Sequence, residues 1–361
     1  MKILFIGKRH PQQRDLIERP YGRFHNLPTA LAAFGHEVQV LLCSHRNFSS
    51  SRVRIAGVEW LNEDLRTLGI SGLYGKLSQH ANEFRPDWVM GVSDTYYGWM
   101  AGRLGRATGA CVAIDAYDNY EAYMPWNLPL HLLWRRSIRA ADLVTAAGPQ
   151  LAQRLQSHRR GGHPVEIIPM VADPEFRPLD KQACRLALGL PSEARLIGYI
   201  GSWARNRGTT MLLDAFRRAR ALQPDLQLVL SGRPPPEALA EPGVVGTGYV
   251  ADVQLPELIN ALDVACVVTA DTSFGRYSYP AKLCEAMACH VPVVATDTAP
   301  VRWMLAGSAD HLVQPGDAAS FSERILDLLD TPRAEYGPRP TWHEHALRLD
   351  QLFSEVVRRK R

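Results

Sequence analysis

The clearest pattern of apolar and polar positions in the chain lies between residues 277 and 296. Leu283, Ala286 and Met287 recur at the spacing of one helical face. The apolar run 291–295 follows directly, and its short length and valine content favour a strand that is buried on both faces. The pattern therefore predicts a helix and a strand in immediate succession, as in the αβ units of a parallel sheet.

The start of this helix is suited to bind an anion. Pro280 fits a first helical turn, Ser278 precedes it as a candidate cap, and the helix is expected to begin near Tyr279. Backbone N–H groups at a helix start carry a partial positive charge, and Lys282 adds a full one. Glu285 is a carboxylate among apolar neighbours, and hydroxyls of a sugar or ribose would give it partners. A phosphorylated ligand is the first hypothesis for this segment.

The same alternation of apolar runs and helical periodicity continues through both halves of the chain. The predicted strands include residues 2–6, 38–42, 87–91, 110–114, 196–200 and 226–230. A chain of 361 residues is too long for one ordinary core. The fold expected is α/β, with two facing Rossmann-like, doubly wound domains and an interdomain cleft. The expected domains cover residues 1–174 and 175–340, and residues 341–361 form a terminal helix with a basic tail.

Composition narrows the class of protein. Apolar residues make up 46% and charged residues 22% of the chain, as in globular rather than disordered proteins. No segment reaches the ~18 apolar residues of a membrane span, and the start M-K-I-L-F-I-G lacks a signal-peptide cleavage site. A cytoplasmic location is therefore expected. The six cysteines are scattered without a metal-binding spacing and are expected to be reduced core thiols.

The net charge of +4 comes from the first half of the chain. An excess of this size is compatible with an anionic acceptor, with lipid headgroups at the inner face of a membrane, or with an ordinary solvated surface, which we favour. No nucleic-acid partner is expected. Residues 128–139 are apolar with three arginines, the composition of a peripheral membrane helix. We favour the crossover helix of a βαβ unit, because an apolar strand follows directly.

A second loop of the C-terminal domain combines glycine with arginine. Gly201 ends a predicted strand and leaves room for a phosphate to approach the backbone, while Arg205 and Arg207 follow in the same loop. Together with Lys282, these arginines suggest one anion held between two cationic segments of the second domain.

Polar residues also follow the predicted strands of the N-terminal domain. Arg23 stands at a predicted helix start, where it is a candidate to neutralise phosphate, and Asp94 comes just past the strand 87–91, where ligands of open α/β sheets bind. Residues 115–121, D-A-Y-D-N-Y-E, form the most polar loop. A solvated loop with a helix cap is the alternative interpretation of that segment.

Within this loop, Asp115 and Asp118 are the candidates for facing an anomeric centre, and they are the predicted catalytic residues. Tyr117 and Glu121 lie beside them in sequence and, with Asp94, are the predicted acceptor-side residues. Acidic and aromatic side chains of this kind suit the recognition of sugar hydroxyls.

The segment P-A-K-L-C-E-A-M-A-C-H-V-P-V-V-A-T resembles the donor-site signature of the retaining glycosyltransferases of family 4, which have the GT-B fold. The resemblance extends over the chain and includes I-P-M-V-A-D-P-E-F-R-P at the expected hinge and L-V-Q-P-G-D near the end. It implies that Glu285 binds the ribose of a nucleotide-sugar and that Gly22 lets the backbone approach the diphosphate. It also implies that the terminal helix crosses back to the first domain.

Several positions depart from the family pattern. Tyr277, which we place with Ser278 among the donor-binding residues, stands where the family has the first of two glutamates. His290 stands where the family has a glycine, and Arg207 where it has a lysine. The family's acidic loop matches Asp115 and Asp118, but its histidine falls on Tyr117. The departures at Tyr277 and His290 concern the sugar-facing part of the site more than the nucleotide part.

The resemblance implies transfer of a hexose or related sugar from a nucleoside-diphosphate donor, with retention at the anomeric carbon and without a metal or other cofactor. The acceptor would be a glycan, a lipid-linked glycan or a small molecule, as in polysaccharide biosynthesis. An inverting GT-B transferase or a nucleotide-sugar epimerase is the nearest alternative, with His25 or Asp94 as candidate base. A non-catalytic sugar-nucleotide binding protein is the alternative from another class. A dinucleotide oxidoreductase is disfavoured, because no G-x-G-x-x-G follows a first strand.

Overall fold

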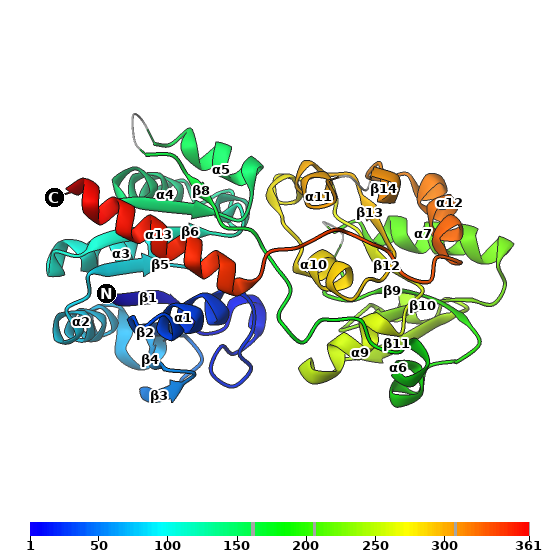
Figure 1. The fold of residues 1–361 in the computed structure, drawn as a ribbon, viewed down its shortest axis with the longest axis horizontal. Coiled ribbons are helices and arrows are strands. Elements are labelled where there is room, and N and C mark those ends of the chain that lie inside the picture. The colour runs from blue at the N-terminus through cyan, green and yellow to red at the C-terminus, as the bar shows by residue number, and fades with distance from the viewer. Residues whose placement is uncertain (160–162, 205–206, 307–308, 361) are drawn as a thin grey trace. The chain divides into compact units, whose positions relative to one another are not determined.

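The computed structural model describes residues 1–159, 163–204, 207–306 and 309–360, and the chain divides into two compact units (Figure 1). Unit 1 consists of Met1–Met170 and Pro340–Arg361, and unit 2 of Val171–Arg339. The sequence-based borders after residues 174 and 340 lie close to these changes of unit.

Unit 1 contains one sheet of eight strands in the order β3-β4-β2-β1-β5-β6-β7-β8. All neighbouring strands are parallel except β3, which pairs with β4 in the antiparallel direction. The elements of unit 1 are β1 (Lys2–Lys8), α1 (Arg23–Ala33), β2 (Glu37–Ser44), β3 (Ser51–Ile55), β4 (Val58–Asp64), α2 (Leu65–Phe84), β5 (Trp88–Gly91), α3 (Thr95–Thr108), β6 (Cys111–Ala116), α4 (Leu128–Ala140), β7 (Leu143–Ala146), α5 (Pro149–Gln156), β8 (Glu166–Ile167) and α13 (Trp342–Lys360).

Unit 2 contains a parallel sheet of six strands in the order β11-β10-β9-β12-β13-β14. The elements of unit 2 are α6 (Lys181–Leu188), β9 (Arg195–Tyr199), α7 (Thr209–Leu222), β10 (Leu226–Ser231), α8 (Pro236–Leu239), β11 (Val244–Gly248), α9 (Leu255–Asn260), β12 (Val264–Val267), α10 (Ala281–Ala288), β13 (Val293–Thr296), α11 (Ala299–Met304), β14 (Leu312–Val313) and α12 (Ala318–Leu328).

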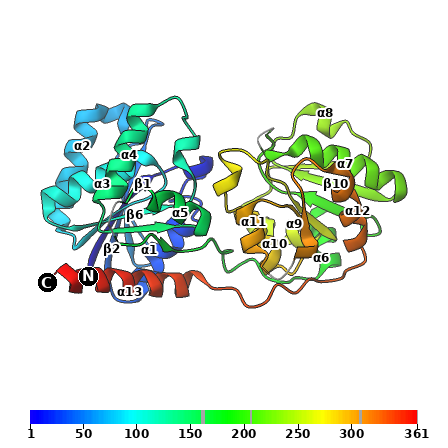
Figure 2. The same ribbon diagram turned by 90° about the horizontal axis from the view of Figure 1, so that it is seen from above.

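Each sheet is covered by helices on both faces. In unit 1, α1 and α13 lie on one face and α2, α3 and α4 on the other (Figure 2). In unit 2, α7 and α12 pack together on one face, where Phe216 and Phe321 are fully buried, and α9 and α10 pack on the other. Strands buried on both faces are nearly all apolar, as β1 and β12 are.

The terminal helix α13 is part of unit 1. Phe353 lies 4.5 Å from Trp88 between ring centroids, and both side chains are buried. His36 bonds to Asp350 at 2.9 Å. The helix therefore completes the core of the N-terminal unit. Two α/β units with doubly wound, largely parallel sheets confirm the predicted fold class.

Candidate functional site

The order of strands in unit 2 marks one edge of its sheet as a ligand site. From β9 the chain moves to β10 and β11 on one side, and it later returns to β12 on the other side of β9. Open parallel sheets bind ligands at such a switch point, beyond the carboxyl ends of the two neighbouring strands. Here the ends of β9 and β12 lead into the Gly201 loop and into the segment that reaches α10.

The start of α10 differs from the prediction. The helix begins at Ala281, not near Tyr279, and Pro280 is its N-cap with an extended ψ of 118°. A residue before proline is disfavoured in the helical region, which explains why Tyr279 stays outside the helix. No side chain caps this end. Ser278 is buried instead, and its N–H donates to the carbonyl of Gly275.

Lys282 reaches from the first turn of α10 to the Gly201 loop. Its ammonium lies 4.8 Å from the centroid of the Tyr199 ring at the end of β9. A Cβ added to Gly201 would stand 1.7 Å from Nζ of Lys282, so only glycine leaves space for the ammonium there. Gly201 also has a φ of +142°, which favours glycine. The structure thus brings together two residues that lie 81 positions apart in the sequence.

Arg207 supplies a second cation beside Lys282. Its guanidinium lies over the Phe274 ring at 5.5 Å from the centroid. Burial and the charge of Arg207 lower the pKa of Lys282 to about 8, against the opposing effect of Glu285. Among the described residues, no ion pair joins either cation to a carboxylate within 4.0 Å. Two neighbouring cations without such a partner form a site with affinity for an anion.

The other predicted donor residues lie around this pair or outside the described part. Glu285 follows Lys282 on α10, close enough for its charge to act on the ammonium. Tyr277 ends the short 3-10 turn Gly275–Tyr277 ahead of the helix. Arg205 lies outside the residues that the structure describes.

Unit 1 has its own switch point, between β1 and β5. Lys8 ends β1, and its N–H donates to the hydroxyl of Ser93 at 2.8 Å. The next residue, Asp94, caps α3 by accepting from the N–H of Thr95 at 2.6 Å. Burial raises the pKa of Asp94, and Lys8 and the bonds from Thr95 oppose that rise. A half-buried carboxylate beside a lysine at this edge is consistent with the predicted acceptor-side role of Asp94.

Arg23 and Asp115 are buried in the interior of unit 1, and this position gives no support to the roles predicted for them. Both side chains are 1% exposed and form a bidentate pair, with N–O distances of 2.8 and 2.6 Å. Asp115 also accepts from the hydroxyl of Thr145, and Arg23 donates to the carbonyl of Ile168. Neither group is accessible to a phosphate or to an anomeric carbon, and the pair holds the interior of unit 1 together. Gly22 is the N-cap of α1 and has a φ of +59°, which favours glycine at the turn that leads into this helix.

Most of the polar loop after β6 is also engaged within unit 1. Glu121 is buried and bonds to Arg135 at 2.7 Å and to Arg154. Burial would raise the pKa of Glu121, but the bonds from these two arginines lower it overall. The carboxylate of Glu121 therefore links the 3-10 turn Tyr120–Ala122 to α4 and α5, and its acceptor-side role stays a prediction.

Asp118 and Tyr117 are buried in the same loop. The hydroxyl of Tyr123 donates to Asp118 at 2.7 Å, and Tyr117 packs edge-to-face on Phe24 at 5.2 Å between centroids. Burial and the charge of Asp118 raise the pKa of Tyr117. The structure therefore gives both residues a packing role, and their predicted roles toward a sugar have no geometric support.

Sequence reasoning missed three residues at the two switch points. Tyr199 and Phe274 lie under the cations of unit 2, and Lys8 lies beside Asp94. Tyr199 ends a buried strand two positions before Gly201, a place that could have marked it. The position of Phe274 depends on how the loop after β12 folds, which no periodicity records.

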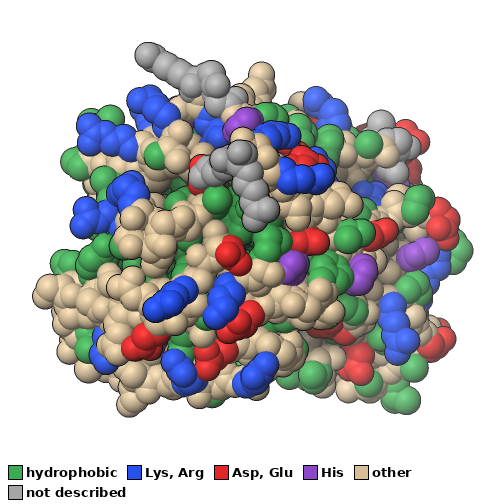
Figure 3. All heavy atoms as spheres, turned by 60° about the vertical axis from the view of Figure 1, so that its left-hand side comes forward, with side chains coloured by type: hydrophobic (Ala, Val, Ile, Leu, Met, Phe, Trp, Pro, Cys, Tyr) green, Lys and Arg blue, Asp and Glu red, His purple; other side chains and the backbone are tan. Residues whose placement is uncertain are grey.

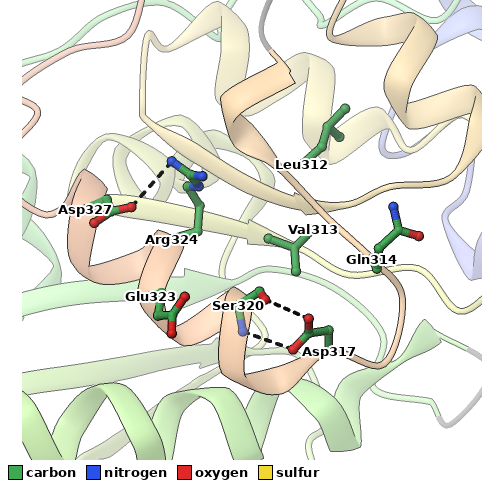
Figure 4. Close-up of a pocket in the computed structure, with 8 residues that line it drawn as sticks. All are labelled: Leu312, Val313, Gln314, Asp317, Ser320, Glu323, Arg324 and Asp327. Atoms are coloured by element: carbon green, nitrogen blue, oxygen red, sulfur yellow. Dashed lines mark hydrogen bonds and ion pairs between the residues drawn. The ribbon is translucent and has the colours of Figure 1, made fainter.

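A pocket of about 300 Å³ lies at the start of α12, and two pairs of its polar lining residues bond to each other (Figure 4). Asp317 caps the helix by accepting from the N–H and hydroxyl of Ser320 at 3.0 and 2.7 Å. Arg324 and Asp327 pair with each other at 3.4 Å. The motif L-V-Q-P-G-D thus ends in a helix cap. In the described part of the chain, no group of three or more His, Cys, Asp or Glu residues has metal-binding geometry.

Two family models match the chain, one on each unit. Residues 23–171 match a glycosyl transferase 4-like domain, and residues 194–331 match the glycosyl transferases group 1. The D-inositol 3-phosphate glycosyltransferase of Stackebrandtia nassauensis is 27% identical over 60% of this chain and 55% of its own length. The phosphatidyl-myo-inositol mannosyltransferase of Mycolicibacterium smegmatis is 29% identical over 58% of this chain and 54% of its own. The alignments thus span about half the length of these relatives.

Solved structures share the fold over the whole chain. Sucrose-phosphate synthase from Thermosynechococcus elongatus has a TM-score of 0.74 at 17% identity, with 99% of both chains covered. HepE from Anabaena, solved in complex with UDP-glucose, has a TM-score of 0.69 at 16% identity, with 99% of this chain and 98% of that chain covered. Two glycosyltransferase domain models thus match the chain, one on each unit, and the chain has the fold of these solved structures, the GT-B fold.

Proposed function

We propose that this chain is a glycosyltransferase that binds a nucleoside-diphosphate-sugar at the β9–α10 edge of unit 2 and transfers the sugar to a hydroxyl group. The observation that carries the proposal is the meeting of Lys282, Arg207 and the Gly201 backbone at the switch point. Two cations beside Gly201, which has no side chain, suit a diphosphate, which needs both charge and close approach to the backbone.

The chemistry assigned to these residues is electrostatic. When the bond between the sugar and the diphosphate breaks, negative charge grows on the leaving oxygen. Lys282 and Arg207 would stabilise that charge, and because both are already held in place, little reorganisation is needed at the moment of reaction. Glu285, one turn along α10, is assigned to the ribose hydroxyls.

The acceptor is proposed to be a hydroxyl of a glycan, a lipid-linked glycan or a small polyol. The names of the two relatives point to inositol derivatives that carry phosphate. Asp94 beside Lys8 is the proposed contact on unit 1, because the carboxylate can orient a hydroxyl and the lysine can meet an anionic substituent. Location at the inner face of a membrane is part of this proposal for a lipid-linked acceptor.

Retention of anomeric configuration is proposed from the resemblance to family 4. Inversion is the second candidate, and the raised pKa of Asp94 favours it, since such a carboxylate can serve as general base toward an acceptor hydroxyl. The configuration of the product, measured by the anomeric proton coupling in NMR, separates the two. A product with the donor's configuration supports retention.

The experiment that tests the proposal is a screen of UDP-, GDP- and ADP-sugars for thermal stabilisation, followed by release of the nucleoside diphosphate with hydroxyl acceptors. A ligand at a hundred times its Kd adds about 2.7 kcal/mol to the free energy of unfolding. Stabilisation by one nucleotide class together with turnover supports the transferase. Stabilisation without turnover for any acceptor indicates a sugar-nucleotide binding protein, and no stabilisation by any donor contradicts the site.

A further inference from the structure

Large apolar side chains are exposed on α4 and on the turn before it. Trp126 is 76% exposed, Leu128 65% and Leu132 57%. Three such residues within seven positions are unusual on a soluble surface and indicate an interaction site. On the face of the molecule in Figure 3, Lys and Arg side chains are interspersed with Asp and Glu, so overall charge marks no surface there. Apolar exposure on α4 is the stronger feature.

Other residues of α4 make its packing contacts within unit 1. Leu130, Trp134 and Ile138 are buried, and Trp134 packs on the Tyr120 ring at 5.2 Å between centroids. The segment is therefore the predicted crossover helix, and its outward face is separate from its packing in unit 1. Leu132 lies on that outward face.

The turn that carries Trp126 is fixed. The side chain of Asn127 caps α4 by accepting from the N–H of Leu130 at 3.2 Å. Nε2 of the buried His131 bonds to the carbonyl of Met124 at 3.0 Å. Because the backbone on both sides is held, Trp126 is kept at the surface by structure and not by disorder.

A basic residue lies on the same side of α4 as the exposed leucines. Leu128, Leu132 and Arg136 are spaced four residues apart, so they lie on one side of α4. Arg136 is exposed, and with Arg106 of α3 it lines a groove of about 480 Å³ between the two helices. In the part of the chain that is described, neither arginine pairs with a carboxylate within 4.0 Å.

The groove itself is shaped by small residues. Gly102, Gly105 and Gly109 line it together with Leu133, so part of its wall is backbone without side chains. The one carboxylate in its lining, Asp142, accepts from the N–H of Val112 at 2.9 Å. An apolar groove with two arginines in its lining matches a lipid, whose chain is apolar and whose headgroup is anionic.

We propose that Trp126, Leu128, Leu132, Arg106 and Arg136, here called the α4 surface, dock unit 1 onto an anionic lipid bilayer. Along a helix that rises 1.5 Å per residue, Arg136 lies about 6 Å from Leu132 and about 12 Å from Leu128. The apolar side chains can therefore enter the outer ~5–10 Å of the bilayer while Arg136 stays at the phosphates. No helix in the described ranges could span a membrane, so this contact is made at the surface.

Sedimentation with vesicles tests the proposal. The full chain is expected to bind vesicles of equal parts phosphatidylcholine and phosphatidylglycerol, and to bind pure phosphatidylcholine at least about tenfold more weakly, since each basic residue near an anionic surface contributes about fivefold. The double variant Trp126→Ser, Leu132→Ser should lose at least about tenfold in binding to the anionic vesicles. Arg136→Glu should weaken the same binding by about tenfold.

A matched control comes from unit 2. Leu186 on α6 is 85% exposed, and Leu186→Ser should leave vesicle binding unchanged. Tryptophan emission gives a second readout, because Trp126 is the most exposed of the eight tryptophans. Its emission should shift to the blue with anionic vesicles, and Trp126→Phe should abolish the shift while most binding remains.

Two results overturn the proposal: a wild-type chain that does not sediment with the anionic vesicles, or a double variant that binds them as the wild type does. If the α4 surface is instead an interface between copies of this chain, the wild type self-associates without lipid and the double variant is monomeric. Donor stabilisation is measured on the same variants and should be unchanged. Failure of membrane docking and failure of the donor site are therefore distinguished.

Discussion

Lys282 carries the charge on which the proposed donor site depends, and its pKa is about 8 before a ligand binds. A bound diphosphate favours the ammonium and therefore raises that pKa. Above pH 8 the free protein is increasingly neutral at Lys282, so binding must take up a proton. We expect the affinity for a nucleotide-sugar to be level below about pH 7.5 and to fall by up to about tenfold per pH unit above about pH 8.

Lys282→Arg is the matched variant for this pH profile. Arginine keeps its charge across the range, so its profile should stay level to about pH 10 even if its absolute affinity is lower. Titration calorimetry at several pH values measures both proteins. A wild-type profile that is level through pH 9.5 would mean that the ammonium does not take part in binding.

Because the Lys282 ammonium lies against Gly201, we expect donor binding to require glycine at this position. In Gly201→Ala the new Cβ meets the ammonium at 1.7 Å and the backbone φ of +142° is strained, so Lys282 must move. We expect at least about a tenfold loss of nucleotide-sugar affinity, equal to about 1.4 kcal/mol. Isothermal titration measures it.

Gly243 provides the control for this substitution. It too has a positive φ, +82°, and a Cβ there would meet the guanidinium of Arg220 at 2.3 Å. Gly243→Ala should lower thermal stability without changing donor affinity. Equal effects of both variants on affinity would mean that Gly201 acts through stability alone.

His290 occupies the left-handed conformation that ends α10, with a φ of +57°. The N–H of Val291 donates to the carbonyl of Ala286, which closes the helix end in the way that glycine favours. His290→Gly relieves this strain and loses only a surface contact with Glu335. Urea unfolding should show a gain of about 0.5–1 kcal/mol. His290→Ala keeps a Cβ and should show no gain.

For single residues, the sequence was informative where local chemistry decides the conformation. Pro280, Lys282 and Gly201 could be identified from motif spacing, and the conformation of His290 explains why the family has glycine at that place. The contacts of Tyr199 and Phe274 could not be identified, because they depend on where two loops meet in three dimensions.

Among the elements, the loop after β6 shows the limit of sequence reasoning. Its acidic residues suggest sugar recognition, yet Asp115 faces inward to Arg23 across 92 positions. No periodicity specifies which charges of a loop turn to the core. The buried parallel strands were predictable, since burial on both faces gives apolar runs, whereas the start of α10 was placed two residues too early.

The buried ion pair between Arg23 and Asp115 is expected to contribute to the stability of unit 1. Asp115→Ala leaves the guanidinium of Arg23 buried without a carboxylate, and such losses cost about 3–5 kcal/mol. The urea concentration at the unfolding midpoint of unit 1 should fall accordingly. Tryptophan emission measures this unfolding. The double variant Arg23→Met, Asp115→Leu should recover most of that loss. A catalytic Asp115 would behave differently, since Asp115→Asn would then lose turnover and keep its stability.

For the whole molecule, the division into two doubly wound units follows from the length of the chain and its alternating pattern, and the structure bears it out. The return of α13 to unit 1 came only from the family resemblance, because an amphipathic helix does not specify which core it covers. Here the burial of Phe353 against Trp88 assigns it. The strand order then locates a switch point in each unit, and the function proposed rests on the one in unit 2.

The most direct measurement of that function is the affinity of the nucleotide-sugar found in the screen for three proteins: wild type, Lys282→Ala, and Lys76→Ala. Lys76 is exposed on α2 of unit 1 and provides a control of equal charge change. Lys282→Ala is expected to lose at least about a hundredfold in affinity, equal to about 2.7 kcal/mol, with its unfolding temperature unchanged, and Lys76→Ala should match the wild type. Equal affinity in all three proteins would show that the donor does not bind at α10.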